Sequence, residues 1–355
     1  MKALILSGGR GERLKPLTNT IAKQLLPVAN KPILYYILEQ ITAAGLNDIG
    51  IVVSPSTGEK IEEAVGDGSY WNAEINYILQ KQPFGLAHAV KTAQDFLGNS
   101  PFLLFLGDNL IESEIKTFIE EFNQQSPDAL ILLKETHTPH LFGIVELDNL
   151  GKVSRLVEKP RKPKSYLALV GIYLFTREIH QAIDQIKPSR RGELEITDAI
   201  QKLIDMGRTV NSHLLTGWWL DIGKKDDLLE ANRGVLESLL QPGIKGNVDP
   251  NSQVMGRVEI REGAILENSV VCGPLSLAEG CRIKDSVIGP FTSIAAEAEI
   301  EHSCVERSVI LESCSISNIK RLEDSVIGRG TKIIGLRRNA RVARLFIGDY
   351  ERLEL

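Results

Sequence analysis

The sequence has no long hydrophobic run and no excess of basic residues. None of its apolar runs reaches the roughly 18 residues that a membrane-spanning helix needs. The first apolar run, residues 3–6, leads directly into glycines and is too short for the core of a signal peptide. Lys and Arg total 41 against 46 Asp and Glu, which gives a net charge of −5 and no basic surface for nucleic acid. We therefore expect a cytoplasmic protein that binds neither membranes nor nucleic acid.

Cysteine and histidine are also scarce. The four cysteines are separated by 9, 23 and 10 positions, which matches neither a C-x-x-C redox pair nor the ligand spacing of a zinc finger. Of the six histidines only His137 and His140 are close together, in a Thr- and Pro-flanked stretch that indicates a loop. The sequence therefore predicts buried free thiols at Cys272, Cys281, Cys304 and Cys314.

The first 240 residues show the pattern of an α/β domain. The whole chain is 43% apolar and 25% charged, the composition of an ordered globular protein with more than one core. Up to residue 240, short β-type runs alternate with helical patterns, which predicts a Rossmann-like, mostly parallel sheet with helices on both faces. Such sheets bind ligands beyond the carboxyl ends of their strands. The expected strands are residues 3–6, 49–53, 75–79, 102–106, 129–133, 143–147, 153–158 and 168–175, and the expected helices are residues 32–44, 58–65, 86–96, 195–206 and 224–240.

A different pattern begins after Gln241-Pro242-Gly243. Aliphatic residues recur every six positions, as at Val248, Val254 and Ile260, with occasional steps of five, and glycines stand between the repeats. Three such steps make one triangular coil, so the segment resembles a hexapeptide-repeat left-handed β-helix over about residues 245–335; an antiparallel sandwich is the alternative. We expect two domains, a catalytic domain over residues 1–240 and a β-helix domain with a C-terminal tail over residues 241–355.

A glycine-rich turn follows the first expected strand. In LSGGRGERL, residues 6–14, the missing Cβ atoms allow backbone N–H groups to approach phosphates closely. Leu14 stands where a dinucleotide-binding fingerprint needs glycine, and the Gly-Lys-Ser/Thr of a Walker loop is missing. Arg10, Arg13 and Lys23 place three cations around the turn, which suits a triphosphate. A solvated basic loop is the alternative interpretation.

Several further motifs follow in a recognisable order. The string GGRGERLKPLT at residues 8–18 is followed by KQLLPV at 23–28, GLAHA at 85–89, LGDN at 106–109, FG at 142–143, EKP at 158–160, RGELEITD at 191–198 and WLD at 219–221. In this order they resemble the sugar-1-phosphate nucleotidylyltransferases over residues 1–240. Within that family, the KQ pair and RGELEITD are most similar to the glucose-1-phosphate thymidylyltransferases, and the β-helix resembles their long subgroup.

The resemblance implies a reaction and a set of catalytic residues. A sugar-phosphate oxygen attacks the α-phosphorus of a nucleoside triphosphate, here dTTP with glucose 1-phosphate, and pyrophosphate leaves. Because a phosphate monoester is largely ionised at pH 7, the protein needs no general base and has to align and neutralise two anions. By the resemblance, Arg13 and Lys23 neutralise the triphosphate and the leaving pyrophosphate, Lys159 holds the sugar phosphate, and Asp108 and Asp221 bind Mg²⁺.

The residue types support these assignments. Asp108 follows a buried apolar run and a glycine, where an open sheet presents a metal-binding carboxylate; a turn-forming Asp108 and a helix-capping Asp221 are the alternatives. Gln80 matches the family glutamine that binds the base, and its amide can accept from pyrimidine N3–H while donating to a ring carbonyl. An exposed turn at Gln80 is the alternative.

The same resemblance supplies the remaining site residues. For the nucleotide they are Leu6, Gly8, Gly9, Gly11, Gln24 and Gly85, together with Arg13 and Gln80. For the sugar phosphate they are Asn109, Gly143, Glu158, Leu169, Tyr173 and Arg191, together with Lys159.

Two positions depart from the family pattern. Glu12 and Ile222 stand where threonine is common, and Glu12 weakens triphosphate binding unless it pairs with Arg10 or Lys15.

Three alternative functions remain open: the same reaction with UTP or another sugar 1-phosphate, a bifunctional enzyme whose β-helix transfers an acyl group, and a non-catalytic regulatory homologue. Because solenoids commonly stack side by side, we also expect a homo-oligomer. A chain ending near Leu240 is expected to keep nucleotidylyl transfer and to lose part of its assembly.

Overall fold

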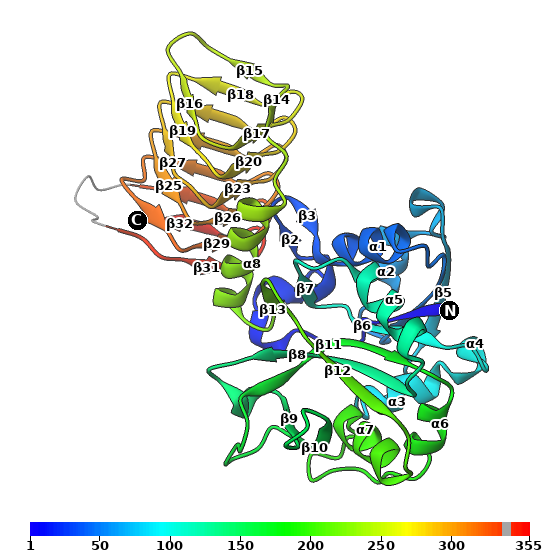
Figure 1. Ribbon diagram of the computed structural model, residues 1–355. Helices are drawn as coiled ribbons and strands as arrows, with labels where there is room; N and C mark the ends of the chain where they lie inside the picture. The colour runs from blue at the N-terminus through cyan, green and yellow to red at the C-terminus, as the bar shows by residue number, and fades with distance from the viewer. Residues whose placement is uncertain (336–341) are drawn as a thin grey trace. The chain divides into compact units, whose positions relative to one another are not determined.

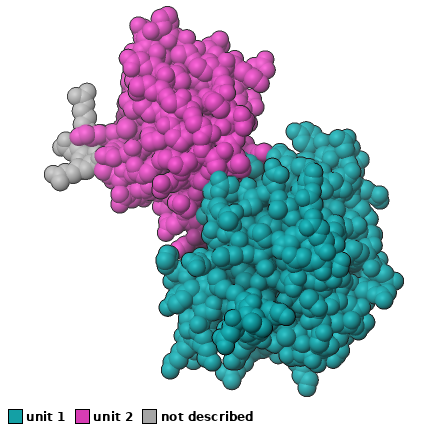
Figure 2. Space-filling model, in the orientation of Figure 1, with its two compact units in different colours: residues 1–10, 34–221 teal, residues 11–33, 222–355 magenta. Residues whose placement is uncertain are grey.

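The computed structural model describes residues 1–335 and 342–355 and divides into two compact units. The first unit contains residues 1–10 and 34–221, and the second contains residues 11–33 and 222–355 (Figure 2). These units differ from the expected division at residues 240 and 241, which stays a prediction. None of the described helices is both long and apolar enough to cross a membrane.

The first unit is built around a nine-stranded mixed sheet (Figure 1). Its parallel part has the order β6 (Phe102–Leu106), β1 (Lys2–Leu6), β4 (Asp48–Val53) and β5 (Glu74–Leu79). Next to β6 lies the antiparallel strand β11 (Leu167–Phe175). The remaining strands pair beyond it: β8 (Ala129–Glu135), β9 (Gly143–Leu147), β10 (Val153–Glu158) and β12 (Val210–Leu214).

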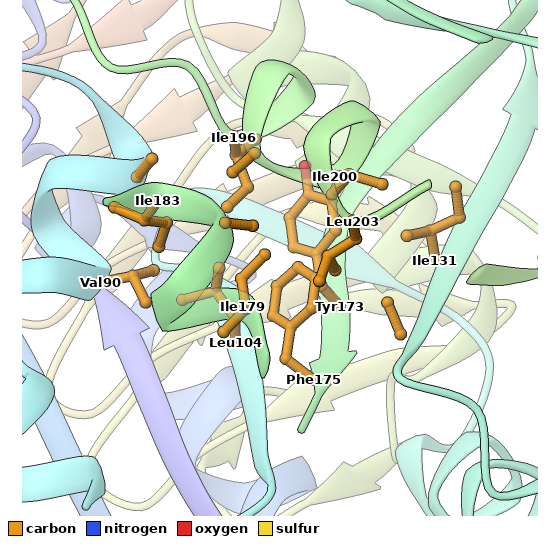
Figure 3. Packing of buried hydrophobic residues seen from close by; sticks show 14 of the residues in the cluster. Val90, Leu104, Ile131, Tyr173, Phe175, Ile179, Ile183, Ile196, Ile200 and Leu203 are labelled. Atoms are coloured by element: carbon orange, nitrogen blue, oxygen red, sulfur yellow. The ribbon is translucent and has the colours of Figure 1, made fainter. Parts of the chain in front are cut away.

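Helices bury this sheet. Leu4 and Leu104 point into a cluster with α3, α6 and α7, whereas Ile5 and Phe105, one residue further along each strand, are buried on the opposite side. Figure 3 shows Ile179, Ile183, Ile196, Ile200 and Leu203 of two of these helices packed around the rings of Tyr173 and Phe175. The α/β fold class is therefore confirmed. The helices of the chain before the β-helix are α1 (Ile33–Ala43), α2 (Gly58–Val65), α3 (Leu86–Thr92), α4 (Gln94–Leu97), α5 (Ile115–Gln125), α6 (Glu178–Ile183), α7 (Ile196–Asp205) and α8 (Lys225–Ser238).

The second unit contains a β-helix of three parallel sheets (Figure 1). One sheet stacks β14 (Gly243–Ile244), β17 (Val258–Ile260), β20 (Leu275–Leu277), β23 (Thr292–Ile294), β26 (Val309–Ile310), β29 (Val326–Ile327) and β31 (Phe346–Ile347). The second stacks β15 (Asn247–Val248), β18 (Ile265–Glu267), β21 (Arg282–Lys284), β24 (Glu299–Glu301), β27 (Ser315–Ser317), β30 (Lys332–Ile334) and β32 (Arg352–Glu354). The third stacks β16 (Gln253–Met255), β19 (Val270–Cys272), β22 (Val287–Ile288), β25 (Cys304–Glu306) and β28 (Leu322–Glu323).

The β-helix coils repeat about every 17 residues. Leu266 pairs with Ile283 and Ile283 with Ile300, and these side chains are buried one above another. Serines form a second column: Ser286 Oγ accepts from the Ser303 N–H at 3.1 Å and donates to the Lys284 carbonyl at 2.7 Å. Two steps of six and one of five make 17, which explains the irregular repeat. The parallel pairing confirms the β-helix and excludes the antiparallel sandwich.

The four cysteines lie in this β-helix as free thiols, as predicted. Cys281 and Cys314 are buried as expected, whereas Cys272 and Cys304 are only half-buried, so the prediction of burial is wrong for these two. Burial raises the pKa of Cys281 to about 12, so its thiol stays protonated and unreactive near neutral pH.

Residues 11–33 are packed against the β-helix and α8 within the second unit. They form the short 3-10 helices η1 (Glu12–Leu14), η2 (Leu17–Asn19) and η3 (Lys23–Leu25) and the pair β2 (Pro27–Val28) and β3 (Lys31–Pro32). Asn30 Nδ2 lies within hydrogen-bond distance of three β-helix acceptors: the Ser276 carbonyl at 3.1 Å, Ser276 Oγ at 3.0 Å and the Ile294 carbonyl at 3.0 Å. The glycine-rich turn therefore continues into a segment that depends on the β-helix for its hydrogen bonds.

Candidate active site

In the first unit, Leu6, Gln80 and Asp108 lie at or just after the carboxyl ends of parallel strands of the sheet. Leu6 and Leu106 are register partners on the parallel strands β1 and β6, and the Gly107 N–H donates to the Leu6 carbonyl at 2.9 Å. On the other side of β1, the Gln80 N–H donates to the Val53 carbonyl at 2.8 Å. The turns after β1, β5 and β6 therefore follow the carboxyl ends of neighbouring strands, where an open sheet binds ligands.

Two acidic residues far apart in the sequence meet at this edge. Strand β7 (Asn109–Ile111) pairs antiparallel with β13 (Trp219–Asp221), which places Asn109 opposite Asp221. Asn109 Nδ2 donates to Asp108 Oδ1 at 2.8 Å, and its Oδ1 accepts from Trp219 Nε1 at 2.6 Å, so both ends of this amide are fixed. Asp108 thus directly precedes Asn109 in the chain, and Asp221 lies opposite Asn109 on the paired strand. Their carboxylate oxygens are the ligand type that a hard divalent cation prefers.

The expected sugar-phosphate residues surround Glu158. Arg191 Nη1 donates to Glu158 Oε1 at 3.1 Å, Lys159 Nζ lies 3.5 Å from the same oxygen, and Thr197 Oγ1 donates to Oε2 at 3.3 Å. Burial raises the pKa of Glu158 above its usual value, while Lys159 and Arg191 oppose this shift. The fully buried Tyr173 also has a raised hydroxyl pKa, first because of its burial and then because of the charges of Glu158 and Asp221. Glu158, Tyr173 and Asp221 are therefore electrostatic neighbours.

Gly143 belongs to the same cluster, and its neighbours leave no room for a larger residue. A Cβ atom at Gly143 would lie 2.6 Å from Thr197 Cγ2, 3.1 Å from Leu169 Cδ1 and 3.2 Å from Glu158 Oε2. The structure thus brings Gly143, Glu158, Lys159, Leu169 and Arg191 together. Thr197 was not predicted individually, although it lies in the RGELEITD motif.

Gln80 is buried between the glycine-rich turn and the start of α3. Its Nε2 lies 3.3 Å from the Gly85 carbonyl and 2.9 Å from His88 Nδ1. Its Oε1 would lie 3.3 Å from a Cβ atom at Gly8, so that close approach favours glycine. The three predicted residues Gly8, Gln80 and Gly85 are therefore neighbours, and the alternative of an exposed turn at Gln80 is wrong. His88, in the GLAHA motif, is a contact that the sequence analysis missed.

The other predicted residues, Gly11, Arg13, Lys23 and Gln24, belong to the second unit. Gly11 has φ +65°, and a Cβ atom there would lie 2.8 Å from Thr18 Cγ2 and 3.1 Å from Lys23 Cβ. Lys23 and Gln24 are both buried in the short helix η3. The Arg13 guanidinium lies against Gly223, where a Cβ atom would approach Arg13 Nη2 to 2.6 Å. The glycines at positions 11 and 223 therefore allow the close packing around Lys23 and Arg13.

The departure at Glu12 is compensated locally. Lys15 Nζ lies 2.6 Å from Glu12 Oε2, so this carboxylate pairs with one of the two cations considered for it. Both side chains are exposed, and such a pair contributes at most about 1 kcal/mol to stability. Its main effect is to neutralise the extra negative charge beside the glycine-rich turn.

Known proteins are similar to this chain in sequence and in structure. A glucose-1-phosphate thymidylyltransferase of Streptomyces griseus is 48% identical over 355 residues, which cover 100% of this chain and 99% of the relative. A solved Bacillus anthracis chain, provisionally named glucose-1-phosphate thymidylyltransferase, has a TM-score of 0.63 and 34% identity and covers 68% of this chain and 97% of its own. A solved UDP-glucose pyrophosphorylase with bound UDP-glucose has a TM-score of 0.60 and 26% identity and covers 66% of this chain and 98% of its own.

The sequence resemblance is confirmed by these relatives and by a family model. The model described as nucleotidyl transferase matches residues 2–238, which include every predicted site residue. Together with the full-length relative, this match shows that the chain belongs to the nucleotidyl transferase family.

Proposed function

We propose that the protein transfers a thymidylyl group from dTTP to glucose 1-phosphate and releases dTDP-glucose and pyrophosphate. The observation that supports this most strongly is the full-length similarity to a glucose-1-phosphate thymidylyltransferase. It is supported further by the carboxylates of Asp108 and Asp221, which come together at the ligand-binding edge of the sheet. The attacking oxygen belongs to the sugar phosphate and is ionised at neutral pH, so the protein contributes alignment and charge neutralisation.

Each group of residues has a task in this reaction. Lys159 holds the sugar phosphate, and Arg13 and Lys23 neutralise the triphosphate and the pyrophosphate that leaves. Asp108 and Asp221 would hold Mg²⁺, which when bound supplies positive charge to the phosphate oxygens. Asn109 orients Asp108 through its 2.8 Å hydrogen bond and thereby keeps one carboxylate oxygen in a fixed direction.

Glu158 has the acceptor oxygens that sugar hydroxyls require. We expect Glu158→Gln to raise the KM for glucose 1-phosphate about 10-fold, since hydrogen bonds to a charged group contribute about 1.5–3 kcal/mol. The raised pKa of Glu158 means that its ionised form is disfavoured by folding, so the stability linked to this group falls as pH rises through that pKa. A neutral glutamine avoids this loss, and Arg191 keeps Glu193 as a partner at 3.1 Å.

Steady-state kinetics and thermal unfolding at pH 7.5 test this prediction together. The melting temperature of Glu158→Gln should equal or exceed that of the wild type while the sugar KM rises. A lowered melting temperature with an unchanged KM would assign Glu158 a structural role instead.

Gln80 is the residue that we assign to the base. Gln80→Ala removes the amide and is expected to weaken dTTP binding by about 1–3 kcal/mol and to lower the selectivity among bases. Isothermal titration of dTTP, together with KM values for several nucleotides, measures both effects. If dTTP affinity and base selectivity both stay at wild-type values, the base site lies elsewhere.

Other substrates are the second candidate, favoured by the similarity to a UDP-glucose pyrophosphorylase. Thymine and uracil differ by one methyl group, which a pocket discriminates by only about 1–3 kcal/mol. A pyrophosphate-release assay with dTTP, UTP, GTP, CTP and ATP against glucose, N-acetylglucosamine and mannose 1-phosphates tests the proposal. The highest kcat/KM should occur with dTTP and glucose 1-phosphate. A higher value for another pair would replace the assigned substrates, and no release with any pair would favour the regulatory homologue.

An acyl-transferring β-helix has less support. Within residues 245–335 the only histidine of the sequence is His302, which is exposed and lies 3.7 Å from Asp285 and 3.6 Å from Glu301.

The homo-oligomer and the cytoplasmic location remain predictions. Light scattering of the full-length protein measures the first, since a monomer would contradict it.

A further inference from the structure

The hydrogen bonds around Gln80 determine the positions of Oε1 and Nε2 in its side-chain amide. The Gly85 carbonyl can only accept a hydrogen bond, so the Gln80 atom 3.3 Å from it has to be the nitrogen. The same nitrogen lies 2.9 Å from His88 Nδ1. With the amide nitrogen directed at Gly85 and His88, Oε1 is directed to the other side, next to Gly8 of the glycine-rich turn.

This arrangement also determines the protonation state and the tautomer of the His88 ring. Because the Gln80 nitrogen is a donor, His88 Nδ1 has to accept, which requires a neutral ring with its proton on Nε2. Burial, and then the charge of Lys91 one turn further along α3, lower the pKa of His88 and favour this neutral ring. The Lys91 ammonium is itself paired with Asp184 at 2.7 Å. The His88 ring packs against Phe84 in a T-shaped arrangement, with ring centroids 5.4 Å apart.

We infer that His88 is a positioning residue for base selection: its Nδ1 holds the Gln80 amide so that Oε1, and not Nε2, faces the bound base. This inference rests on the proposed function and on the assignment of Gln80 to the base. It replaces the earlier expectation that the amide both accepts from and donates to the pyrimidine, since both hydrogens of Nε2 have partners within the protein.

With Oε1 facing the base, the site prefers a base that has a hydrogen-bond donor at position 3. Thymine and uracil both have an N–H at position 3, which can donate to Oε1, whereas the N3 atom of cytosine has a lone pair that Oε1 repels. If His88 loses its acceptor, only the 3.3 Å hydrogen bond to the Gly85 carbonyl still opposes a 180° rotation of the amide. The rotated amide, which presents Nε2 and tolerates cytosine, then costs one hydrogen bond where it cost two before. His88 should therefore affect the choice between thymine and cytosine and have no effect on the choice between thymine and uracil.

Substitutions of His88 test this inference in the full-length enzyme. His88→Leu and His88→Phe both remove the acceptor, and the phenylalanine retains a ring against Phe84. We expect each to lower the dTTP-to-CTP ratio of kcat/KM about 3- to 10-fold, the effect of losing one hydrogen bond, mainly through KM. The dTTP-to-UTP ratio should stay at its wild-type value. His88→Asn places an amide oxygen near the position of Nδ1 and should restore most of the dTTP-to-CTP ratio.

A matched control separates this effect from a general disturbance of α3. Thr92 Oγ1 donates to the His88 carbonyl at 2.8 Å, so Thr92→Val perturbs the same turn and leaves Nδ1 in place. It should leave both ratios unchanged. Circular dichroism of each variant establishes that it is folded before its ratio is interpreted.

The outcomes distinguish this inference from the proposed base site. If His88→Leu and His88→Phe are folded and keep the wild-type dTTP-to-CTP ratio while Gln80→Ala lowers it, the role of His88 is refuted and the base site stands. If Gln80→Ala also keeps the wild-type ratio, the assignment of the base site to Gln80 is refuted as well. A lowered ratio that His88→Asn restores supports the inference.

Discussion

Replacing Asp108 or Asp221 with asparagine is expected to lower turnover at least ~100-fold, the effect of losing strong electrostatic stabilisation of the transition state. Asparagine has nearly the same shape as aspartate and keeps the β7–β13 pairing of Asn109 with Asp221, so the fold should change little. The expected loss therefore reports on charge and on metal binding. It is measured as kcat at saturating dTTP and glucose 1-phosphate over a wide range of Mg²⁺ concentrations.

Asp95→Asn is a suitable control, because Asp95 is an exposed carboxylate of the same unit in the short helix α4. Its kcat should equal that of the wild type. An Asp108 or Asp221 variant that retains near-normal kcat at saturating Mg²⁺ would show that the residue is not a principal metal ligand.

The second large effect is expected on removal of the β-helix, residues 241–355. The sequence alone predicts that a chain ending near Leu240 keeps its chemistry, but the structure leads us to expect the opposite. Without the β-helix, Asn30 loses all three of its acceptors, and the buried Asn232 of α8 loses two of its three partners. Because Arg13 and Lys23 lie in the segment that these contacts support, we expect kcat/KM to fall at least ~100-fold, as for other losses of charge stabilisation.

A point substitution tests the same support without removing a domain. Asn232 is fully buried; its Oδ1 accepts from the Ala29 N–H at 2.8 Å and from Ser293 Oγ at 2.9 Å, and its Nδ2 donates to the Phe291 carbonyl at 3.0 Å. Asn232→Leu leaves these three groups without their partner and should lower the stability of the second unit. Thermal unfolding measures this stability, and an Asn232→Leu variant as stable as the wild type would contradict the support assigned to Asn232. A truncated chain that is folded and has wild-type kcat/KM would contradict the support assigned to the β-helix.

Much of the fold could be predicted because its patterns are local. The apolar run of β6 and the aliphatic repeat of the β-helix both depend on short-range periodicity, and both are present as predicted. The predicted helix at residues 86–96 is interrupted at Ala93 and forms α3 and α4. The predicted strands at residues 143–147 and 153–158 have the bounds of β9 and β10.

The remaining features depend on contacts between distant segments. Asn30 and Ser276 are 246 positions apart, and no periodicity connects them, so the docking of residues 11–33 on the β-helix could not be predicted. The same applies to the pairing of Asn109 with Asp221, which depends on two short strands that the sequence does not mark. His88 and Thr197 lie in quoted motifs, but only the side-chain geometry shows that they contact Gln80 and Glu158.

The most direct test of the proposed function is ³¹P nuclear magnetic resonance of the wild-type protein with dTTP, glucose 1-phosphate and Mg²⁺. We predict that dTTP and glucose 1-phosphate disappear in equal molar amounts while dTDP-glucose, with its two phosphorus signals, and pyrophosphate, with one signal, appear in equal molar amounts. Unchanged substrates, or dTTP breakdown without any sugar nucleotide, would contradict the proposal.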